Sequence, residues 1–283
     1  MAKALIGKVA ALWRYPVKSM LGEMIAETSV SLGGVVGDRA WALREVASAR
    51  VLTAKKYPKL FAMSAAYEGS PDLGESAPLR ITLPDGATIR ASDPDASGKL
   101  SAALGFEVLL VRPHQGQMEL AGIDPATVFG EVGIENIYPG LTAAAAPDFV
   151  PLPEGTFFDS AVIHVLASGT LEHLRRLAGG KSRFDPRRFR PNIYVETAGD
   201  SGGFVEDQWL AGTLEVGDAV KITAMRPATR CVMTTHPQQE LERDPAVLRL
   251  AAKDHRACVG VYGAIGAPGT IHVGDPVFLV IGS

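Results

Sequence analysis

The chain has 283 residues, 47% of them hydrophobic and 21% charged, a balance typical of a globular protein with a sizeable core. Its formal net charge of −3 excludes an overall basic field that would attract nucleic acid or an anionic membrane surface. The sequence has no run of roughly 18 uncharged apolar residues, so no membrane span is predicted. Its two cysteines exclude a disulfide framework and an ordinary four-cysteine iron–sulfur cluster, and they favour a reducing, cytoplasmic location.

The first 112 residues predict mainly strands. Residues 8–17 and 23–32 are rich in β-branched and aromatic residues, and residues 79–92 read as a hairpin. Pro84, Asp85 and Gly86 supply the turn of this hairpin. One short helix is expected at residues 98–105, before a strand at 106–112.

Residues 113–156 carry repeated proline and glycine and show no sustained hydrophobic period. Such a stretch predicts a long connection that crosses between two domains or covers a site.

Strands and two short helices are expected from residue 157 to the end. One helix opens at Thr170 and ends at Gly179, and the second has Asp244 as its cap and Pro245 in its first turn. Three short strands finish the chain. Few helices, many short strands and frequent turns predict a mixed, mainly β fold: a β-barrel-like core with attached helices.

Residues 181–192 form the most basic stretch of the chain. Pro191 biases Arg190 towards extended geometry, which would point Arg188, Arg190 and Asn192 to the same side. Two guanidinium groups and an amide on one face suit a phosphate or another planar oxyanion. A solvated charged loop is the alternative. Three further polar residues lie at strand ends or turns: Lys18, Ser19 and Arg39. Each could contact an anion or be an ordinary solvated loop residue.

Cys231 is the sharper candidate, because Arg230 precedes it directly and Arg226 lies five residues before it. A free cysteine is most often buried filler, but nearby positive charge favours the thiolate, which is a soft metal ligand. Cys258 lies in an apolar strand and is expected in the core. No histidine has zinc-site spacing, while a Cys–His dyad with His236 or His255 stays open.

Several motifs together resemble one known family. "LWRYPVKSMLGE" (12–23), "GDRAWAL" (37–43) and "VLTAKKYPKL" (51–60) resemble the N-terminal β-barrel domain that accompanies MOSC domains. "RFRPNIYVE" (188–196), "FVEDQWLAGTLEVGDAV" (204–220), "RPATRCVMTTHPQ" (226–238) and "GVYGAIGAPGTIHVGDPV" (260–277) resemble the MOSC domain, in the same order. The family includes amidoxime reducing components and the sulfur-carrying end of molybdenum cofactor sulfurase. The resemblance implies a smaller N-terminal β-barrel domain at 1–112, a connecting or covering segment at 113–156 and a MOSC domain at 157–283.

The resemblance also implies a cofactor, molybdenum-molybdopterin, with the metal held by the pterin dithiolene and by Cys231. The family's cofactor contacts carry over to Lys18, Ser19, Arg39, Gly169, Thr170, Arg190, Asn192, Thr229, Arg230 and Tyr262. Asp207 matches an acidic position of the family, either structural or near the metal, and is retained as a candidate catalytic residue.

The implied reaction is two-electron reduction of an N-hydroxylated compound, with electrons from a separate ferredoxin, flavoprotein or haem protein. Two alternatives stay open. The protein could be a cofactor carrier or sulfur-transfer module with a persulfide on Cys231, or a barrel-type binding protein that has lost the cofactor.

Overall fold

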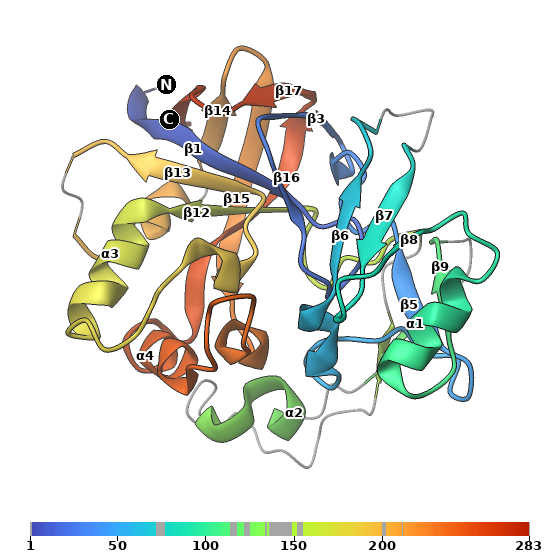
Figure 1. The fold of residues 1–283 in the computed structure, drawn as a ribbon. Coiled ribbons are helices and arrows are strands. Elements are labelled where there is room, and N and C mark those ends of the chain that lie inside the picture. The colour runs from blue at the N-terminus through green and yellow to red at the C-terminus, as the bar shows by residue number, and fades with distance from the viewer. Residues whose placement is uncertain are drawn as a thin grey trace.

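The structure is a computed structural model that describes residues 2–71, 77–113, 118–121, 125–133, 135, 149–151, 155–199, 202–210 and 212–282. Seven of the described strands close into a barrel (Figure 1). They are β13 (Ile193–Thr197), β12 (Ile163–Ala167), β16 (Cys258–Ala267), β15 (Val220–Thr229), β14 (Thr213–Val216), β18 (Pro276–Ile281) and β1 (Ala2–Arg14). Only the β12–β13 pair is parallel among these neighbours.

The first strand closes this barrel. One edge of β1 pairs with β13, where Leu12 stands opposite Ile193, and the other edge pairs with β18, where Ala4 stands opposite Leu279. A small barrel has room inside only for side chains. Apolar side chains fill it here, including Val9, Leu12, Val165, Ile193, Val195, Trp209, Leu214, Ile222 and Val261.

A second core lies in the N-terminal part of the chain (Figure 1). It is built from β5 (Ala42–Glu45), η1 (Pro58–Ala62), β6 (Ser64–Tyr67), β7 (Leu79–Thr82), β8 (Thr88–Arg90), α1 (Ala96–Leu104) and β9 (Val108–Val111). The other N-terminal strands are β2 (Glu23–Ile25), β3 (Glu27–Ser31) and β4 (Gly34–Val35), and their buried apolar side chains join the barrel core instead. The predicted hairpin is confirmed as β7–β8, with Ile81 opposite Ile89, and the predicted short helix is confirmed as α1.

The two parts of the chain are interleaved. β1 precedes the N-terminal elements yet belongs to the barrel, and β17 (Gly269–His272) leaves the barrel region to pair with β3. Both ends of the described chain lie together at the barrel (Figure 1). The mainly β fold is therefore confirmed, while a division at residue 112 stays a prediction, since three strand pairings cross it: β1–β13, β1–β18 and β3–β17.

The two predicted helices of the C-terminal part are also confirmed. α3 (Ser168–Leu177) and α4 (Pro245–His255) share an apolar cluster that includes Leu171, Leu174, Val247 and Ala251. Asp244 caps α4 as expected, because its carboxylate accepts a hydrogen bond from the amide of Ala246 at 3.0 Å. No helix in the described ranges is both long and apolar enough to cross a bilayer.

Part of the segment 113–156 is described. β10 (Glu119–Ala121) pairs with β11 (Phe149–Pro151), and α2 (Pro125–Phe129) runs into η2 (Gly130–Val132). Phe129 and Val132 pack against Leu248 and Ala252 of α4. Residues 136–148 lie outside the described ranges.

The closing role of β1 gives a first prediction. Leu12→Ala should lower the free energy of unfolding by about 2–5 kcal/mol, because Leu12 is 0% exposed inside the barrel. Leu5→Ala on the same strand is the matched control, since Leu5 is 56% exposed and should change stability by less than about 0.5 kcal/mol. Urea denaturation measures both, and equal effects would contradict the assigned register of β1.

Candidate active site

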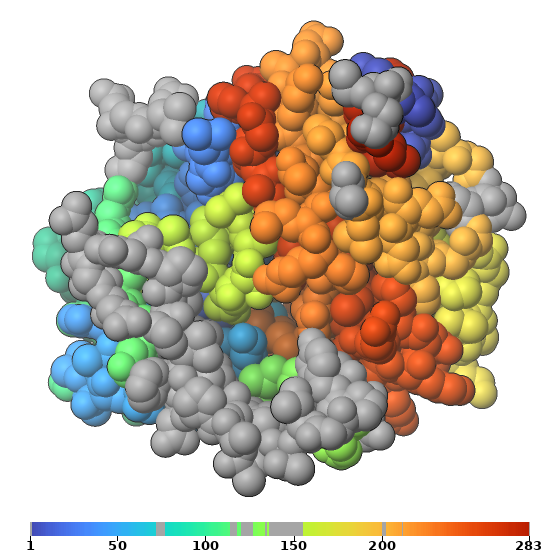
Figure 2. Space-filling view, turned by 180° about the vertical axis from the view of Figure 1, so that it is seen from behind, coloured from blue at the N-terminus to red at the C-terminus, as the bar shows by residue number. Residues whose placement is uncertain are grey.

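A cavity of about 240 Å³ lies between the barrel and the N-terminal part and takes lining residues from both. The loop after β1, the turn before β5, the segment before β12, α2, and the ends of β15 and β16 all contribute. Figure 2 shows the segment that begins at residue 155 on the surface above a hollow beside α2. Nine residues predicted from the sequence line the cavity: Lys18, Ser19, Arg39, Arg190, Asn192, Thr229, Arg230, Cys231 and Tyr262.

Three of these residues have an unusual backbone. Ser19, Arg39 and Arg190 have φ angles of 67°, 47° and 55°, in the left-handed region that residues with a side chain rarely adopt. Each such conformation costs roughly 1–3 kcal/mol and persists only where the surrounding structure enforces it. That all three line one cavity indicates that these turns serve to aim side chains into it.

Arg39 and Arg190 form an arginine pair around Tyr15. Their guanidinium carbons lie 4.8 and 4.1 Å from the centre of the Tyr15 ring. Burial, together with the positive charge of Arg39, lowers the pKa of Arg190 to about 10. Both groups are still charged at neutral pH, so two like charges sit close together and favour an anion between or beside them.

The buried carboxylate of Asp38 holds this arrangement. It accepts hydrogen bonds from the amide of Tyr15 at 2.7 Å and from the Asn192 side chain at 2.9 Å, and it pairs with Arg39. The oxygen of Asn192 in turn accepts from the amide of His164 at 3.1 Å. Asn192 thus lines the cavity, but its polar atoms already hold β12 and the N-terminal turn in place.

A lysine pair forms a second group of cations. The ammonium of Lys18 donates to the carbonyl of Phe157 at 2.7 Å and to the carboxylate of Asp159, whose other oxygen lies 3.3 Å from the ammonium of Lys55. Burial lowers the pKa of Lys18 against the opposing effect of Asp159. Against its own burial, Asp159 has its pKa held well below the usual range by the two lysines.

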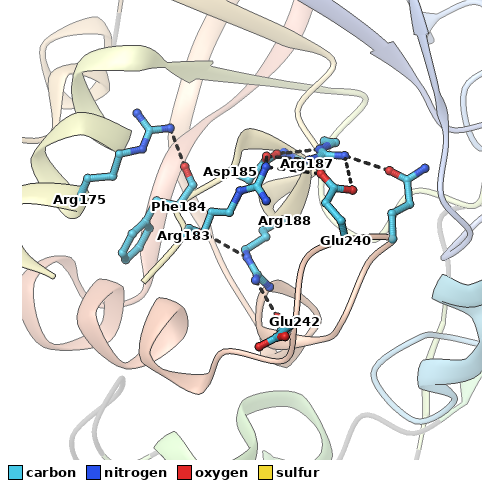
Figure 3. Close-up of polar contacts among 9 residues, drawn as sticks. Arg175, Arg183, Phe184, Asp185, Arg187, Arg188, Glu240 and Glu242 are labelled. Carbon is cyan, nitrogen blue, oxygen red and sulfur yellow. Dashed lines mark hydrogen bonds and ion pairs between the residues drawn. The ribbon is translucent and has the colours of Figure 1, made fainter. Parts of the chain in front are cut away.

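The predicted extended geometry of residues 188–192 is wrong. Pro186–Phe189 form the 3-10 helix η4, which Asp185 caps and the left-handed Arg190 ends. Arg188 still touches the cavity wall, but its guanidinium donates to backbone carbonyls, at 2.7 Å in the case of Glu242 (Figure 3). The other acceptors are the carbonyls of Arg183, Thr234 and His236. Arg188 therefore braces the loop that follows Cys231 and does not present a free fork to a ligand.

Cys231 lines the cavity just after the end of β15 and directly precedes η6 (Val232–Thr235). Its side chain is partly exposed and packs at the border of the N-terminal core. Beside it, Nη2 of Arg230 donates to the carbonyl of Phe189, while its buried Nε has no hydrogen-bond partner among the described residues. An unpaired buried donor is costly, so this one indicates a ligand with acceptor atoms.

His164 lies on β12 and lines the cavity. Burial and the nearby charge of Arg230 lower its pKa well below the usual value, so the ring is neutral. Its Nε2 lies 3.3 Å from the carbonyl of Val259, and its Nδ1 is buried without a partner among the described residues. The ring is thus a second polar group with unused hydrogen-bonding capacity at this wall.

Three predicted site residues lie outside the cavity lining. Thr170 is fully buried and binds the carboxyl group of Glu206 through its hydroxyl. Gly169 lines a separate surface depression beside α3. Asp207 accepts a hydrogen bond from His255 at 2.9 Å, and its side chain is 47% exposed. These three residues belong to motifs that match the family, but the fold places them away from the cavity lining.

The structure bears on two predictions from the sequence, the core position of Cys258 and a Cys–His dyad. Cys258 is partly exposed at the start of β16, so its assignment to the core is wrong. Neither His236 nor His255 is among the described residues that line the cavity with Cys231. Within the same residues, no group of three or more His, Cys, Asp or Glu side chains could hold a metal ion. A metal at Cys231 would therefore need a ligand that brings its own donor atoms.

The comparisons with known proteins agree with this geometry. A family model described as the MOSC domain matches residues 153–278, and one described as the MOSC N-terminal beta barrel domain matches residues 6–107. The chain is a MOSC-domain protein with an N-terminal MOSC β-barrel domain. This membership supports a protein that binds the molybdenum cofactor.

The relatives of this MOSC protein are distant but cover nearly all of it. It is 25% identical over 309 aligned positions to mitochondrial amidoxime-reducing component 1 of Mus musculus, covering 97% of this chain and 83% of that protein. It is 24% identical over 314 positions to mitochondrial amidoxime reducing component 2 of Homo sapiens, covering 98% and 84%. The YuaD protein of Bacillus subtilis aligns with a TM-score of 0.48 at 10% identity, covering 100% of this chain and 99% of that one.

Sequence reasoning missed four polar residues of the site: Asp38, Lys55, Asp159 and His164. Asp38 and Lys55 lie inside motifs that match the N-terminal domain, so their positions carried a signal without indicating a role. Asp159 lies shortly before the apolar strand β12 and His164 lies within it, where nothing in the local pattern separates a cavity residue from a packed one.

The Glu206–Thr170 pair generates a prediction about pH. Burial raises the pKa of Glu206 from 4.5 to about 7, against the hydrogen bonds from Thr170 and Ala167. The folded chain therefore binds this proton more tightly than the unfolded chain, so this contribution to stability is full below pH 4.5 and is lost as pH rises to about 7. Glu206→Gln cannot ionise.

We expect the free energy of unfolding of the wild type to fall relative to Glu206→Gln between pH 5 and 8, by up to about 3 kcal/mol. Urea titrations at four pH values across this range measure the difference. Parallel pH profiles for the two proteins would show that the carboxyl group is not buried as described.

Proposed function

We propose that this protein is a molybdenum-cofactor-dependent reductase of N-hydroxylated compounds. The observation that carries the proposal is the meeting of Cys231 with five basic side chains in one cavity. These are Lys18, Arg39, Lys55, Arg190 and Arg230, which come from segments far apart in the sequence. The family and the names of its amidoxime-reducing relatives support the same activity.

The residues present fit a large anionic cofactor. The buried Nε of Arg230 lacks an acceptor among the described residues, and the arginine pair of Arg39 and Arg190 is an excess of positive charge beside one carboxylate, Asp38. Arg39 and Arg190 would bind a terminal phosphate through paired, charge-assisted hydrogen bonds. The sulfur of Cys231 would hold the molybdenum, because a thiolate is a soft ligand.

The reaction converts R–NH–OH, two electrons and two protons into R–NH₂ and water. When bound, the cofactor supplies the two-electron centre that removes the hydroxyl oxygen. The chain binds and orients: Asp38 fixes Arg39 and the carbonyl of Met20 holds Arg190, while Phe129, Phe157 and Met233 supply an apolar wall that limits access of water. Electrons would come from a separate ferredoxin, flavoprotein or haem protein. The proposal includes a cytoplasmic location, which the two free cysteines favour, whereas the mammalian relatives are named mitochondrial.

A second candidate is a cofactor carrier or a sulfur-transfer module with a persulfide on Cys231. The partial exposure of Cys231 beside Arg230 favours it to the same degree, since a cationic wall also stabilises a persulfide anion. Retained molybdenum together with turnover of an amidoxime supports the reductase, whereas labile sulfur without turnover supports the carrier.

The metal-binding role of Cys231 is tested by replacing it with alanine, with the same replacement of Cys258, the other cysteine of the chain, as the control. Protein made in a cofactor-competent host should retain molybdenum near one atom per chain on gel filtration, and Cys231→Ala should lose most of it. Cys258→Ala should keep it, because Cys258 lies outside the cavity lining. Plasma mass spectrometry measures the metal, and reduction of an amidoxime with a reduced viologen dye measures turnover. Equal molybdenum in both variants would refute Cys231 as the ligand.

A further inference from the structure

The carboxylate of Asp159 stands between two lysines that both line the cavity. Lys18 is 5% exposed and Lys55 is 12% exposed, while the Asp159 side chain is 36% exposed. Its two oxygens are divided between the two ammonium groups, one each. A single carboxylate thus pairs with two cations at a wall that is open to the cavity, and one positive charge is left in excess.

This carboxylate differs from Asp38, the other acid that pairs with a cavity cation. Asp38 is fully buried at its side chain and accepts from the Tyr15 amide and from Asn192 as well as from Arg39, so it cannot leave without breaking the fold. The described side-chain contacts of Asp159 are the two lysines alone. Asp159 is therefore free to rotate away if another anion takes its place.

Lys18 would remain in position without Asp159. Lys18 is also held by the carbonyl of Phe157, which is itself fully buried, and the amide of Lys18 donates to the carbonyl of Trp41 at 2.8 Å. Against the burial of Lys55, attraction to Asp159 and to the negative form of Cys231 raises the pKa of Lys55. Lys55 thus lies within electrostatic reach of the cysteine as well as of Asp159.

We propose that Lys18 and Lys55 form a second anion subsite of the cavity, on the side of Cys231, which Asp159 occupies until an oxyanionic ligand displaces it. The subsite rests on the proposed function only in that the same cavity receives an anionic cofactor. Lys55 is then a further binding residue that the sequence did not indicate. Asp159 stabilises the empty protein and weakens binding, because a ligand must first displace it.

Inorganic phosphate is the probe, and the full chain is made in a host that cannot synthesise the pterin cofactor. Asp159→Asn should bind phosphate about tenfold more tightly at pH 7, since the competing charge is gone and both lysines are freed. It should also melt at a lower temperature without phosphate and recover when phosphate is added. Asp254→Asn, on the exposed face of α4, is the matched control and should change neither value.

Lys55→Met should weaken phosphate binding about tenfold. Lys56→Met makes the same chemical change at the adjacent, exposed lysine, outside the cavity lining, and should leave binding unchanged. The double variant decides whether the two residues share one subsite, because Asp159→Asn should tighten binding less once Lys55 is gone and only Lys18 is freed. Isothermal titration calorimetry gives the dissociation constants.

The proposal is overturned if Asp159→Asn leaves phosphate affinity unchanged or lowers it, or if Asp159→Asn tightens binding equally with and without Lys55. Neither result affects the proposed function, which depends on molybdenum retention and amidoxime turnover by the loaded protein. Conversely, a chain that binds phosphate as expected but never retains molybdenum would keep the subsite and refute the reductase.

Discussion

One buried carboxylate joins the two halves of this protein. Asp38 lies in an N-terminal turn, and it binds the end of β1 through Tyr15, the C-terminal part through Asn192, and the cavity through Arg39. A buried charge is stable only when it is paired and fully hydrogen-bonded, so these partners must come together for the chain to fold. The position of the arginine pair, and with it the cavity, follows from that requirement.

The cavity built on this junction has an excess of positive charge. Lys18, Arg39, Lys55, Arg190 and Arg230 line it, and Asp159 is the one acid among its described lining residues. Burial, together with the like charge of Arg39, lowers the pKa of Arg190. Proteins keep such an arrangement where it serves a function, and an anionic guest relieves it. The left-handed backbones of Ser19, Arg39 and Arg190 add local strain at the same place.

Most of the site could be predicted because the family motifs carry its residues in short, ordered runs. What could not be predicted were residues whose role depends on a partner far away in the chain. Asp159 lies more than a hundred residues from Lys18 and Lys55, and no local pattern links them. Asp207 and Thr170 lie outside the cavity lining for a related reason, because membership of a motif does not set the direction of a side chain. Asp207 is hydrogen-bonded to His255, and Thr170 is hydrogen-bonded to Glu206.

The sequence by itself determined the local elements: the β7–β8 hairpin from its Pro-Asp-Gly turn, α3 from its leucine spacing, and α4 from the Asp244 cap. It also determined that Cys231 and several basic residues belong together. Only the tertiary structure decided that β1 closes the barrel, that Arg188 braces a loop, and that Asp159 joins two lysines. Hydrogen bonds within a turn or helix are encoded by neighbouring residues, whereas these contacts depend on which distant segments the packed core brings together.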